Sequence, residues 1–365
     1  MSENPLLELK ALGQSIWLDY IERDLLGGGG LARLIEDDGI AGVTSNPSIF
    51  HQAITSTGQY DKEISTLADS GAVATTIYNE LVISDIRQAA DILHPVYTTT
   101  AGQDGYVSLE VSPHLANETD ASLEQARSLW QQVDRQNLMI KIPGTPEGLP
   151  AIEQLVYEGI NVNVTLLFSV TRYAEVARAY LRGLQRRLDA GLPLDSVASV
   201  ASFFLSRIDS AIDKQLPQDH ELRGSIAIAS ARSAYITYQK ICASDEWHTL
   251  AAAGARPQRL LWASTSTKNP AYSDTLYVDE LIGPETVNTV PPKTLDAYRD
   301  HGKPAVRVTD GATQALQAIA ALPDHGIDLE TVTTMLESDG VNKFIASFDS
   351  LMQALESERV RLKSA

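Results

Sequence analysis

A single lysine interrupts an apolar stretch of the sequence. Lys141 lies within Leu-Met-Ile-Lys-Ile-Pro-Gly-Thr (138–145), and Pro143-Gly144 ends the apolar run. A short apolar run that ends in Pro-Gly is typical of a buried strand in a parallel sheet. A buried ammonium is costly unless it pairs with a carboxylate or loses its proton. Lys141 is therefore either a structural lysine beside a buried carboxylate or a nucleophile that forms a Schiff base with a carbonyl compound.

Further polar side chains occur inside strand-like runs or directly after them. They include two acids, Asp19 and Glu110, and one arginine, Arg207. The others are amides and hydroxyls: Asn46, Asn163, Thr165, Ser202 and Ser264. A single residue of this kind is usually a hydrogen-bonded core residue, but a set from seven strands that can converge on one cavity points to chemistry. Two acids, one lysine and several hydroxyls and amides suit carbonyl chemistry without a metal.

These residues need a scaffold that brings the ends of many strands together. Short apolar and alternating runs predict eight strands, separated mostly by segments of helical periodicity. The predicted strands are residues 15–21, 41–45, 106–112, 138–143, 161–167, 197–204, 259–264 and 287–290. Such an alternation within about 290 residues predicts an α/β fold, the (β/α)8 or TIM barrel, whose catalytic residues follow the carboxyl ends of the strands. A doubly wound sheet is the alternative, but its glycine-rich first turn is absent.

Helical periodicity continues beyond the last predicted strand. We expect residues 1–304 to form the catalytic barrel domain and residues 305–365 to form a C-terminal helical extension packed on it. Within that extension, the pattern predicts helices over 313–321, 328–337 and 341–361.

The composition argues against several classes of function. The 365-residue chain has a net charge of −18 and a pI near 4.8, which disfavours nucleic acid and anionic membranes as partners. No apolar run approaches the roughly 20 residues of a membrane span, and the N-terminus lacks the pattern of a signal peptide. The single cysteine, Cys242, allows no internal disulfide. No Cys/His group has metal-ligand spacing and no glycine-rich phosphate motif occurs. We therefore expect a cytoplasmic enzyme without a metal or an organic cofactor.

Five motifs, in the order in which they occur, resemble those of the transaldolase family. They are Trp-Leu-Asp-Tyr (17–20), Gly-Val-Thr-Ser-Asn-Pro-Ser (42–48), Ser-Leu-Glu-Val-Ser-Pro (108–113), Met-Ile-Lys-Ile-Pro-Gly-Thr (139–145) and Ile-Asn-Val-Asn-Val-Thr-Leu-Leu-Phe-Ser (160–169). The resemblance covers almost all of residues 1–300, and the C-terminal extension resembles the longer bacterial form. It implies transfer of a dihydroxyacetone unit from sedoheptulose 7-phosphate or fructose 6-phosphate to an aldose phosphate, in the non-oxidative pentose phosphate pathway. Sugar phosphates are then the expected partners, and we expect a monomer or a homodimer.

The resemblance also implies a role for each matching residue. Lys141 would be the Schiff-base nucleophile, and Asp19 the acid and base at the carbon–carbon bond that breaks. Glu110, with Thr165, would hold the water that carries protons while the carbinolamine forms and dehydrates. The implied substrate contacts are Asn46 and Asn163 with the dihydroxyacetone portion, Ser202 with its terminal hydroxyl, and Arg207 with the phosphate.

The chain departs from the family pattern at two places. After the seventh strand the family commonly has Ser-Phe-Arg, whereas this chain has Ala-Ser-Thr-Ser-Thr-Lys-Asn (263–269). Ser264 aligns well with the serine, and Lys268 can supply the second phosphate-binding charge without the bidentate geometry of arginine. Phe203 stands where proline is common, which should change only the local stiffness of the backbone.

Two alternative functions compete with the transferase. A free-standing fructose 6-phosphate aldolase shares the lysine but releases dihydroxyacetone, and that related family carries glutamine at the position of Glu110 and tyrosine at that of Phe204. Both residues here favour the transferase, and Phe204 is the expected gate between the two outcomes. A non-catalytic sugar-phosphate-binding protein is the other alternative, and the intact trio of Asp19, Glu110 and Lys141 argues against it.

Overall fold

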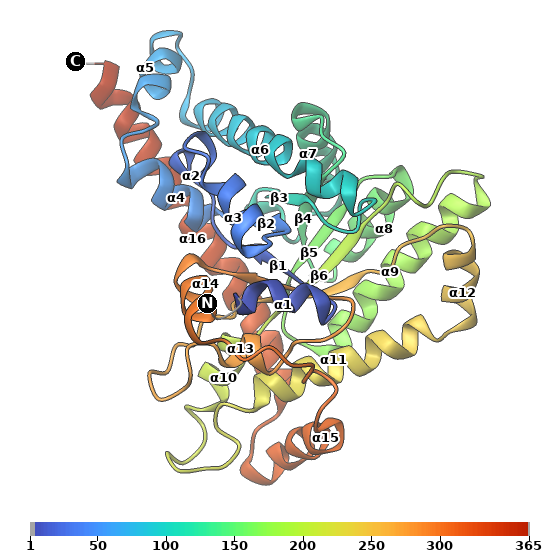
Figure 1. Ribbon diagram of the computed structural model, residues 1–365. Helices are drawn as coiled ribbons and strands as arrows, with labels where there is room; N and C mark the ends of the chain where they lie inside the picture. Colours follow the sequence, from blue (N-terminus) through green and yellow to red (C-terminus); the bar gives the residue numbers. More distant parts are fainter. Residues whose placement is uncertain (1–3, 364–365) are drawn as a thin grey trace.

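Eight parallel strands close into a barrel in the computed structural model, which describes residues 4–363 (Figure 1). The strands follow one another around the barrel in chain order, and β1 closes the ring by pairing with β8. They are β1 (Gln14–Leu18), β2 (Gly42–Val43), β3 (Tyr106–Glu110), β4 (Leu138–Pro143), β5 (Val162–Leu167), β6 (Ser199–Phe204), β7 (Arg259–Ala263) and β8 (Thr286–Val290). The predicted (β/α)8 fold and the place of each predicted strand are confirmed.

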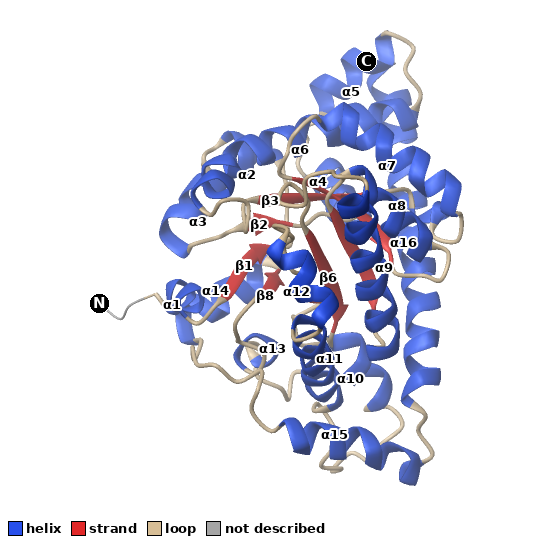
Figure 2. Cartoon of the chain, turned by 90° about the vertical axis from the view of Figure 1, so that its right-hand side faces the viewer, coloured by secondary structure: helices blue, strands red, loops and turns tan. Residues whose placement is uncertain are grey.

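Helices alternate with the strands and cover the outside of the barrel (Figure 2). Strands β3 to β8 are buried at every position, because the barrel interior covers one face and the helices cover the other. The helices up to the last strand and just beyond it are α1 (Pro5–Ala11), α2 (Arg23–Gly27), α3 (Gly30–Asp38), α4 (Pro47–Ser56), α5 (Asp61–Asp69), α6 (Ala74–Thr99), the 3-10 helix η1 (Pro113–Leu115), α7 (Thr119–Val133), α8 (Gly148–Glu158), α9 (Val170–Asp189), α10 (Ser206–Ile212), α11 (Ile226–Cys242), α12 (Asp245–Ala252), α13 (Leu276–Asp279) and α14 (Pro292–His301).

Side chains cap the helices that start at the carboxyl ends of two strands. Asn46 precedes α4, and its Oδ1 accepts hydrogen bonds from the backbone N–H groups of Ser48 (3.0 Å) and Ile49 (3.1 Å). Pro47 at the first helical position has a backbone angle that suits this start. Ser169 caps α9 in the same way, through a 3.2 Å hydrogen bond from the backbone N–H of Arg172.

Two residues at this end of the barrel have left-handed backbone angles although they are not glycines. Leu166 has φ +61°, where the register between β5 and β6 shifts, and Ser264 has φ +56° just after β7. Such angles cost free energy and are found where a loop or a functional site requires them. Leu166 directly follows Thr165, and Ser264 is itself one of the residues that the sequence assigns to chemistry.

The C-terminal extension contains α15 (Ala312–Ala321), the 3-10 helix η2 (Leu322–His325) and α16 (Leu329–Lys363). The prediction of two separate helices over 328–337 and 341–361 is wrong, because a single helix of 35 residues runs through Gly340. One glycine inside a helix costs only about 1 kcal/mol relative to alanine. Packing of α16 against α4, α5 and α6 outweighs that cost, and Figure 1 shows the helix in red crossing beside these elements.

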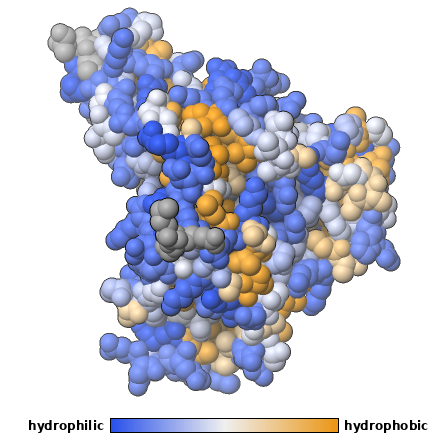
Figure 3. Space-filling view, viewed as in Figure 1, coloured by the Kyte–Doolittle hydropathy of each residue, from blue (hydrophilic) through white to orange (hydrophobic). Residues whose placement is uncertain are grey.

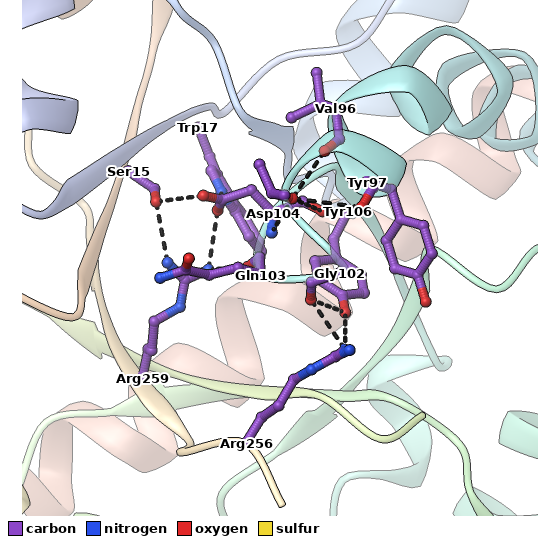
Figure 4. Close-up of polar contacts among 11 residues, drawn as sticks. Ser15, Trp17, Val96, Tyr97, Gly102, Gln103, Asp104, Tyr106, Arg256 and Arg259 are labelled. Atoms are coloured by element: carbon purple, nitrogen blue, oxygen red, sulfur yellow. Dashed lines mark hydrogen bonds and ion pairs between the residues drawn. The ribbon is translucent and has the colours of Figure 1, made fainter. Parts of the chain in front are cut away.

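The opposite end of the barrel, where the strands begin, contains a buried polar network (Figure 4). Arg259 and Asp104 form an ion pair of 2.9 Å. Asp104 also accepts hydrogen bonds from the hydroxyl of Ser15 (2.7 Å) and the indole N–H of Trp17 (3.1 Å). Arg256 donates to backbone carbonyls of the loop before β3. Residues at this end of a TIM barrel serve stability rather than catalysis, so we assign the network a structural role.

The surface is largely hydrophilic on the face shown in Figure 3, with apolar residues gathered near its centre and at its right-hand edge. Within residues 4–363, no helix has the length and the apolar character that a membrane span requires.

Candidate active site

The carboxyl ends of the strands surround a cavity of about 790 Å³. Nearly all residues that the sequence assigned to chemistry contribute to its wall. These are Asp19, Asn46, Lys141, Thr165, Ser202, Phe204, Arg207, Ser264 and Lys268. The two predicted residues that do not line the cavity are Glu110 and Asn163, which are buried, 8% and 0% exposed.

Lys141 stands at the floor of this cavity beside a buried carboxyl group. The ammonium Nζ lies 3.7 Å from Oε2 of Glu110 and donates a 3.0 Å hydrogen bond to the backbone carbonyl of Ser45. The strand register explains the pairing, since Glu110 and Lys141 occupy opposite positions on β3 and β4. Lys141 therefore has the carboxylate partner that a structural lysine needs, and it also faces a cavity, as a Schiff-base nucleophile must.

Glu110 is held in a low-polarity environment. Burial raises the pKa of its carboxyl group to about 7, although the charge of Lys141 acts in the opposite direction. Neither carboxyl oxygen has a hydrogen-bond partner among residues 4–363, and the same is true of the hydroxyl of Thr165. A carboxyl group with a pKa near neutrality can both accept and donate a proton under physiological conditions.

Asp19 follows β1 and completes the group of ionisable residues. Its Oδ1 accepts a 2.7 Å hydrogen bond from the hydroxyl of Thr44, which in turn lies 2.7 Å from the hydroxyl of Thr289. Burial raises the pKa of Asp19, while the bond from Thr44 and the charge of Lys141 lower it. Two carboxyl groups and one amine therefore share one electrostatic environment.

Asn163 is fully buried and does not line the cavity. It is paired with Lys141 across β4 and β5, and it precedes Thr165 by two residues, so it lies roughly 6 to 7 Å deeper than Thr165 along the same face of β5. Its amide nitrogen donates to the hydroxyl of Ser108 (3.0 Å), and its amide oxygen accepts from the hydroxyl of Ser202 (2.7 Å). Asn163 thus holds Ser202, which does line the cavity.

Positive charge is concentrated on the side of the cavity formed by β6, β7 and β8. Arg207 opens α10 directly after β6, and Lys268 lies in the loop after β7, where its Nζ donates to the hydroxyl of Ser266 (2.7 Å). Burial and the neighbouring charge of Arg207 lower the pKa of Lys268. Lys293, in the first turn of α14, lines the same cavity. A protein with a net charge of −18 therefore presents three cations at this one place.

Ser264, which has a left-handed backbone just after β7, helps to hold the cationic side of the cavity in place. The hydroxyls of Ser264 and Ser206 lie 2.8 Å apart, and the backbone N–H of Ser206 donates to the carbonyl of Ser264. These bonds join the loop after β7 to the start of α10, which carries Arg207.

The structure adds lining residues that the sequence interpretation did not select. Thr44 and Ser48 lie inside one of the recognised motifs, so their proximity to Asn46 was the signal that could have identified them. Lys293 follows the last strand, and a charge after a barrel strand is a detectable signal. Phe344 comes from α16, and nothing in the sequence near it indicates that it reaches the cavity.

The fold and the site define a barrel enzyme whose cavity combines a buried lysine, two carboxyl groups that its charge affects and a cationic side. Comparison with known proteins identifies its family. The model of the transaldolase/fructose-6-phosphate aldolase family matches residues 16–355, and the chain belongs to that family.

Curated relatives cover the whole length of the chain. "Transaldolase 2" of Nostoc sp. is 50% identical over an alignment of 380 positions, which spans all of both chains. The transaldolase of Mycobacterium tuberculosis is 49% identical over 360 residues, 96% of each chain, and that of Saccharopolyspora erythraea is 48% identical over 363 residues, 98% of this chain and 99% of the relative. The chain is thus an enzyme, a transferase of the transaldolase type, and the predicted family and class of activity are confirmed.

Proposed function

We propose that the chain moves a dihydroxyacetone unit from a ketose phosphate, such as fructose 6-phosphate or sedoheptulose 7-phosphate, to an aldose phosphate. The observation that carries this proposal is the position of Lys141, at the floor of the cavity with Glu110 beside it, where the charge of Lys141 acts on both Glu110 and Asp19. The cationic side formed by Arg207 and Lys268 suits the phosphate of either substrate.

The first step is attack of the Lys141 amine on the ketone carbon. The resulting carbinolamine loses water to give an iminium ion, and this loss requires a proton on the departing hydroxyl. Glu110 is placed to supply that proton, directly or through a water held with Thr165, because its pKa of about 7 keeps part of it protonated near neutral pH.

Cleavage follows from the electron demand of the iminium ion. Asp19, as a carboxylate, takes the proton from the hydroxyl on the fourth carbon, and the bond between the third and fourth carbons breaks. Its electron pair moves into the iminium group and forms an enamine, while the aldose phosphate leaves. Because the nitrogen of Lys141 accepts these electrons, the step uses only groups of the chain and the substrate.

Transfer is the reverse sequence with a second aldose phosphate. The enamine carbon attacks the new aldehyde, and Asp19, now protonated, returns its proton to the new hydroxyl. Asn46, whose Oδ1 caps α4, offers its amide N–H groups to the dihydroxyacetone portion, and Ser202 does so with its hydroxyl, which Asn163 orients. Lys268 and Arg207 hold the phosphate of each partner in turn.

The same chemistry without an acceptor would make the chain a fructose 6-phosphate aldolase. Phe204 favours the transferase, because its ring, 8% exposed, presents no hydroxyl group that could protonate the waiting enamine. We place this enzyme in the cytoplasm, as a monomer or homodimer, with residues 1–304 as the catalytic barrel and residues 305–365 as the extension.

The proposal is tested by product analysis with fructose 6-phosphate and a four-carbon aldose phosphate. We expect a seven-carbon ketose phosphate and glyceraldehyde 3-phosphate in equal amounts, and little free dihydroxyacetone. If free dihydroxyacetone equals glyceraldehyde 3-phosphate in the presence of acceptor, the chain is an aldolase and the transfer proposal is wrong.

A further inference from the structure

The long C-terminal helix α16 turns one line of residues toward the barrel. Leu336, Phe344, Leu351 and Leu355 are buried along it, and residues three or four positions apart lie on the same face of a helix. Gly340 occupies the same line, midway between Leu336 and Phe344. The apolar line therefore has one position without a side chain.

That position lies directly over residues of the active site. A methyl group on Gly340 would lie 3.0 Å from Cδ2 of Leu166, 3.5 Å from Cε2 of Phe168 and 3.6 Å from Nη1 of Arg207. The distance to Leu166 is shorter than ordinary packing allows. The distances to Phe168 and Arg207 are ordinary contacts for a methyl group, but they leave no room for a larger side chain. Glycine thus lets the backbone of α16 approach the end of β5 and the start of α10 closely.

Arg207 is enclosed from two sides by this arrangement. Its guanidinium carbon lies 5.9 Å from the ring centroid of Phe204, whose ring contacts Phe168 at 5.3 Å between centroids. Nη1 is buried and has no hydrogen-bond partner among residues 4–363. The guanidinium therefore lies between an aromatic ring and the backbone of α16, where the charge of Asp339 also acts on it.

We propose that Gly340 is a positioning residue for Arg207, and that α16 thereby sets the affinity of the site for phosphorylated sugars. The inference rests on the proposed function, in which Arg207 holds the substrate phosphate. Leu166, the residue nearest to Gly340, has a left-handed backbone and directly follows Thr165, and its Cδ2 would have to shift by a few tenths of an ångström to admit a methyl group. A methyl group would therefore press on Leu166 at the end of β5, whereas a larger side chain would also displace Arg207, whose Nη1 lies at ordinary contact distance.

The test is steady-state kinetics of the Gly340→Ala variant with a phosphorylated and an unphosphorylated donor, fructose 6-phosphate and dihydroxyacetone. The neighbours must move by a few tenths of an ångström, and a misplacement of about 1 Å costs on the order of 10²-fold. We expect the KM for fructose 6-phosphate to rise about fourfold in Gly340→Val, whose added methyl groups reach Arg207, and to rise less in Gly340→Ala. The KM for dihydroxyacetone should be unchanged in both variants.

The matched control is Asn342→Ala, an exposed position half a turn further on α16. Both substitutions raise helix propensity, so neither thermal midpoint should fall on that account, but only the change at Gly340 adds atoms beside Arg207. The KM of the folded enzyme does not depend on how much of the sample is folded, so a less stable variant still answers the question.

Two results would overturn the inference. One is an unchanged KM for fructose 6-phosphate in both Gly340 variants, and the other is an equal rise for both donors, which would mean that α16 blocks the cavity rather than positions Arg207. Failure of the proposed function itself looks different, because the unmodified chain would then fail to transfer dihydroxyacetone between aldose phosphates.

Discussion

Glu110 and Lys141 face each other from neighbouring strands, with Oε2 3.7 Å from Nζ, and the carboxyl group has no hydrogen bond from any residue of the described chain 4–363. The lysine therefore has a partner close enough to exchange protons through a small intervening group, yet it remains free to bond to a substrate carbon. A fully hydrogen-bonded ion pair would have fixed both groups and favoured the purely structural interpretation.

The burial of Glu110 makes the stability of the protein depend on pH. Its pKa is raised from 4.5 to about 7, so the folded state binds the proton more tightly than the unfolded state does. This residue therefore lowers the free energy of unfolding as the pH rises from about 4.5 to about 7, by about 3 kcal/mol in all. Glu110→Gln should remove that part of the pH dependence, so the variant should gain stability relative to the parent at pH 8 but not at pH 4.5.

Urea unfolding at the two pH values measures this effect. Glu36→Gln, at an exposed position, serves as the control and should follow the parent at both pH values. A Glu110→Gln variant whose stability differs from the parent by the same amount at both pH values would show that the buried carboxyl group does not titrate in this range.

Thr44 should control the pH at which Asp19 acts. Its hydroxyl donates to the Asp19 carboxylate at 2.7 Å and lowers the pKa of that acid. Thr44→Val keeps the shape but removes the donor, so the pKa of Asp19 rises and less of it is ionised at low pH. We expect kcat/KM to fall about threefold to tenfold more at pH 6 than at pH 8. The pH profile of Thr55→Val, at an exposed position, should match that of the parent. Equal losses of kcat/KM at both pH values in Thr44→Val would show that Thr44 does not act through the pKa of Asp19.

The eight strands and most of the site were predictable because the signals are local. Pro143-Gly144 ends β4, and the polar residues that follow apolar runs line the cavity because a barrel aligns the ends of its strands. The depth of Asn163 was not predictable, since it depends on the register between β4 and β5 and on the stagger of the barrel. The sequence predicts a break between 337 and 341, where Gly340 lies, because a sequence pattern shows the cost of glycine but not the close approach that this glycine allows.

Arg207 should act mainly on the binding of phosphate. Arg207→Ala removes several charge-assisted hydrogen bond donors, so the KM for phosphorylated substrates should rise by about 10²-fold while the KM for dihydroxyacetone stays nearly constant. Lys268 is more exposed, and Lys268→Ala should raise the same KM by about threefold to tenfold. Initial rates with the two kinds of donor check this expectation. A similar rise for phosphorylated and unphosphorylated donors would exclude a phosphate-specific role.

Phe204 should decide whether the enamine waits for an acceptor. Its apolar ring lines the cavity beside Lys141 and Arg207, and an apolar surface offers no proton to the enamine. Phe204→Tyr should raise the release of free dihydroxyacetone from fructose 6-phosphate severalfold and lower transfer to an added aldose phosphate. The assay is the ratio of the two products with and without acceptor. If the tyrosine variant divides its products as the parent does, Phe204 is a packing residue and another group controls the outcome.

The most direct test of the central claim is mass spectrometry of the protein after borohydride reduction in the presence of fructose 6-phosphate. A Schiff base is reduced to a stable amine, so the intermediate remains attached to its lysine. We predict that the peptide containing Lys141 gains the mass of the reduced sugar adduct, and that Lys141→Ala, which should lose at least about 10³-fold in transfer rate, gains none. An adduct on a different lysine, or an adduct that persists in Lys141→Ala, would contradict the account.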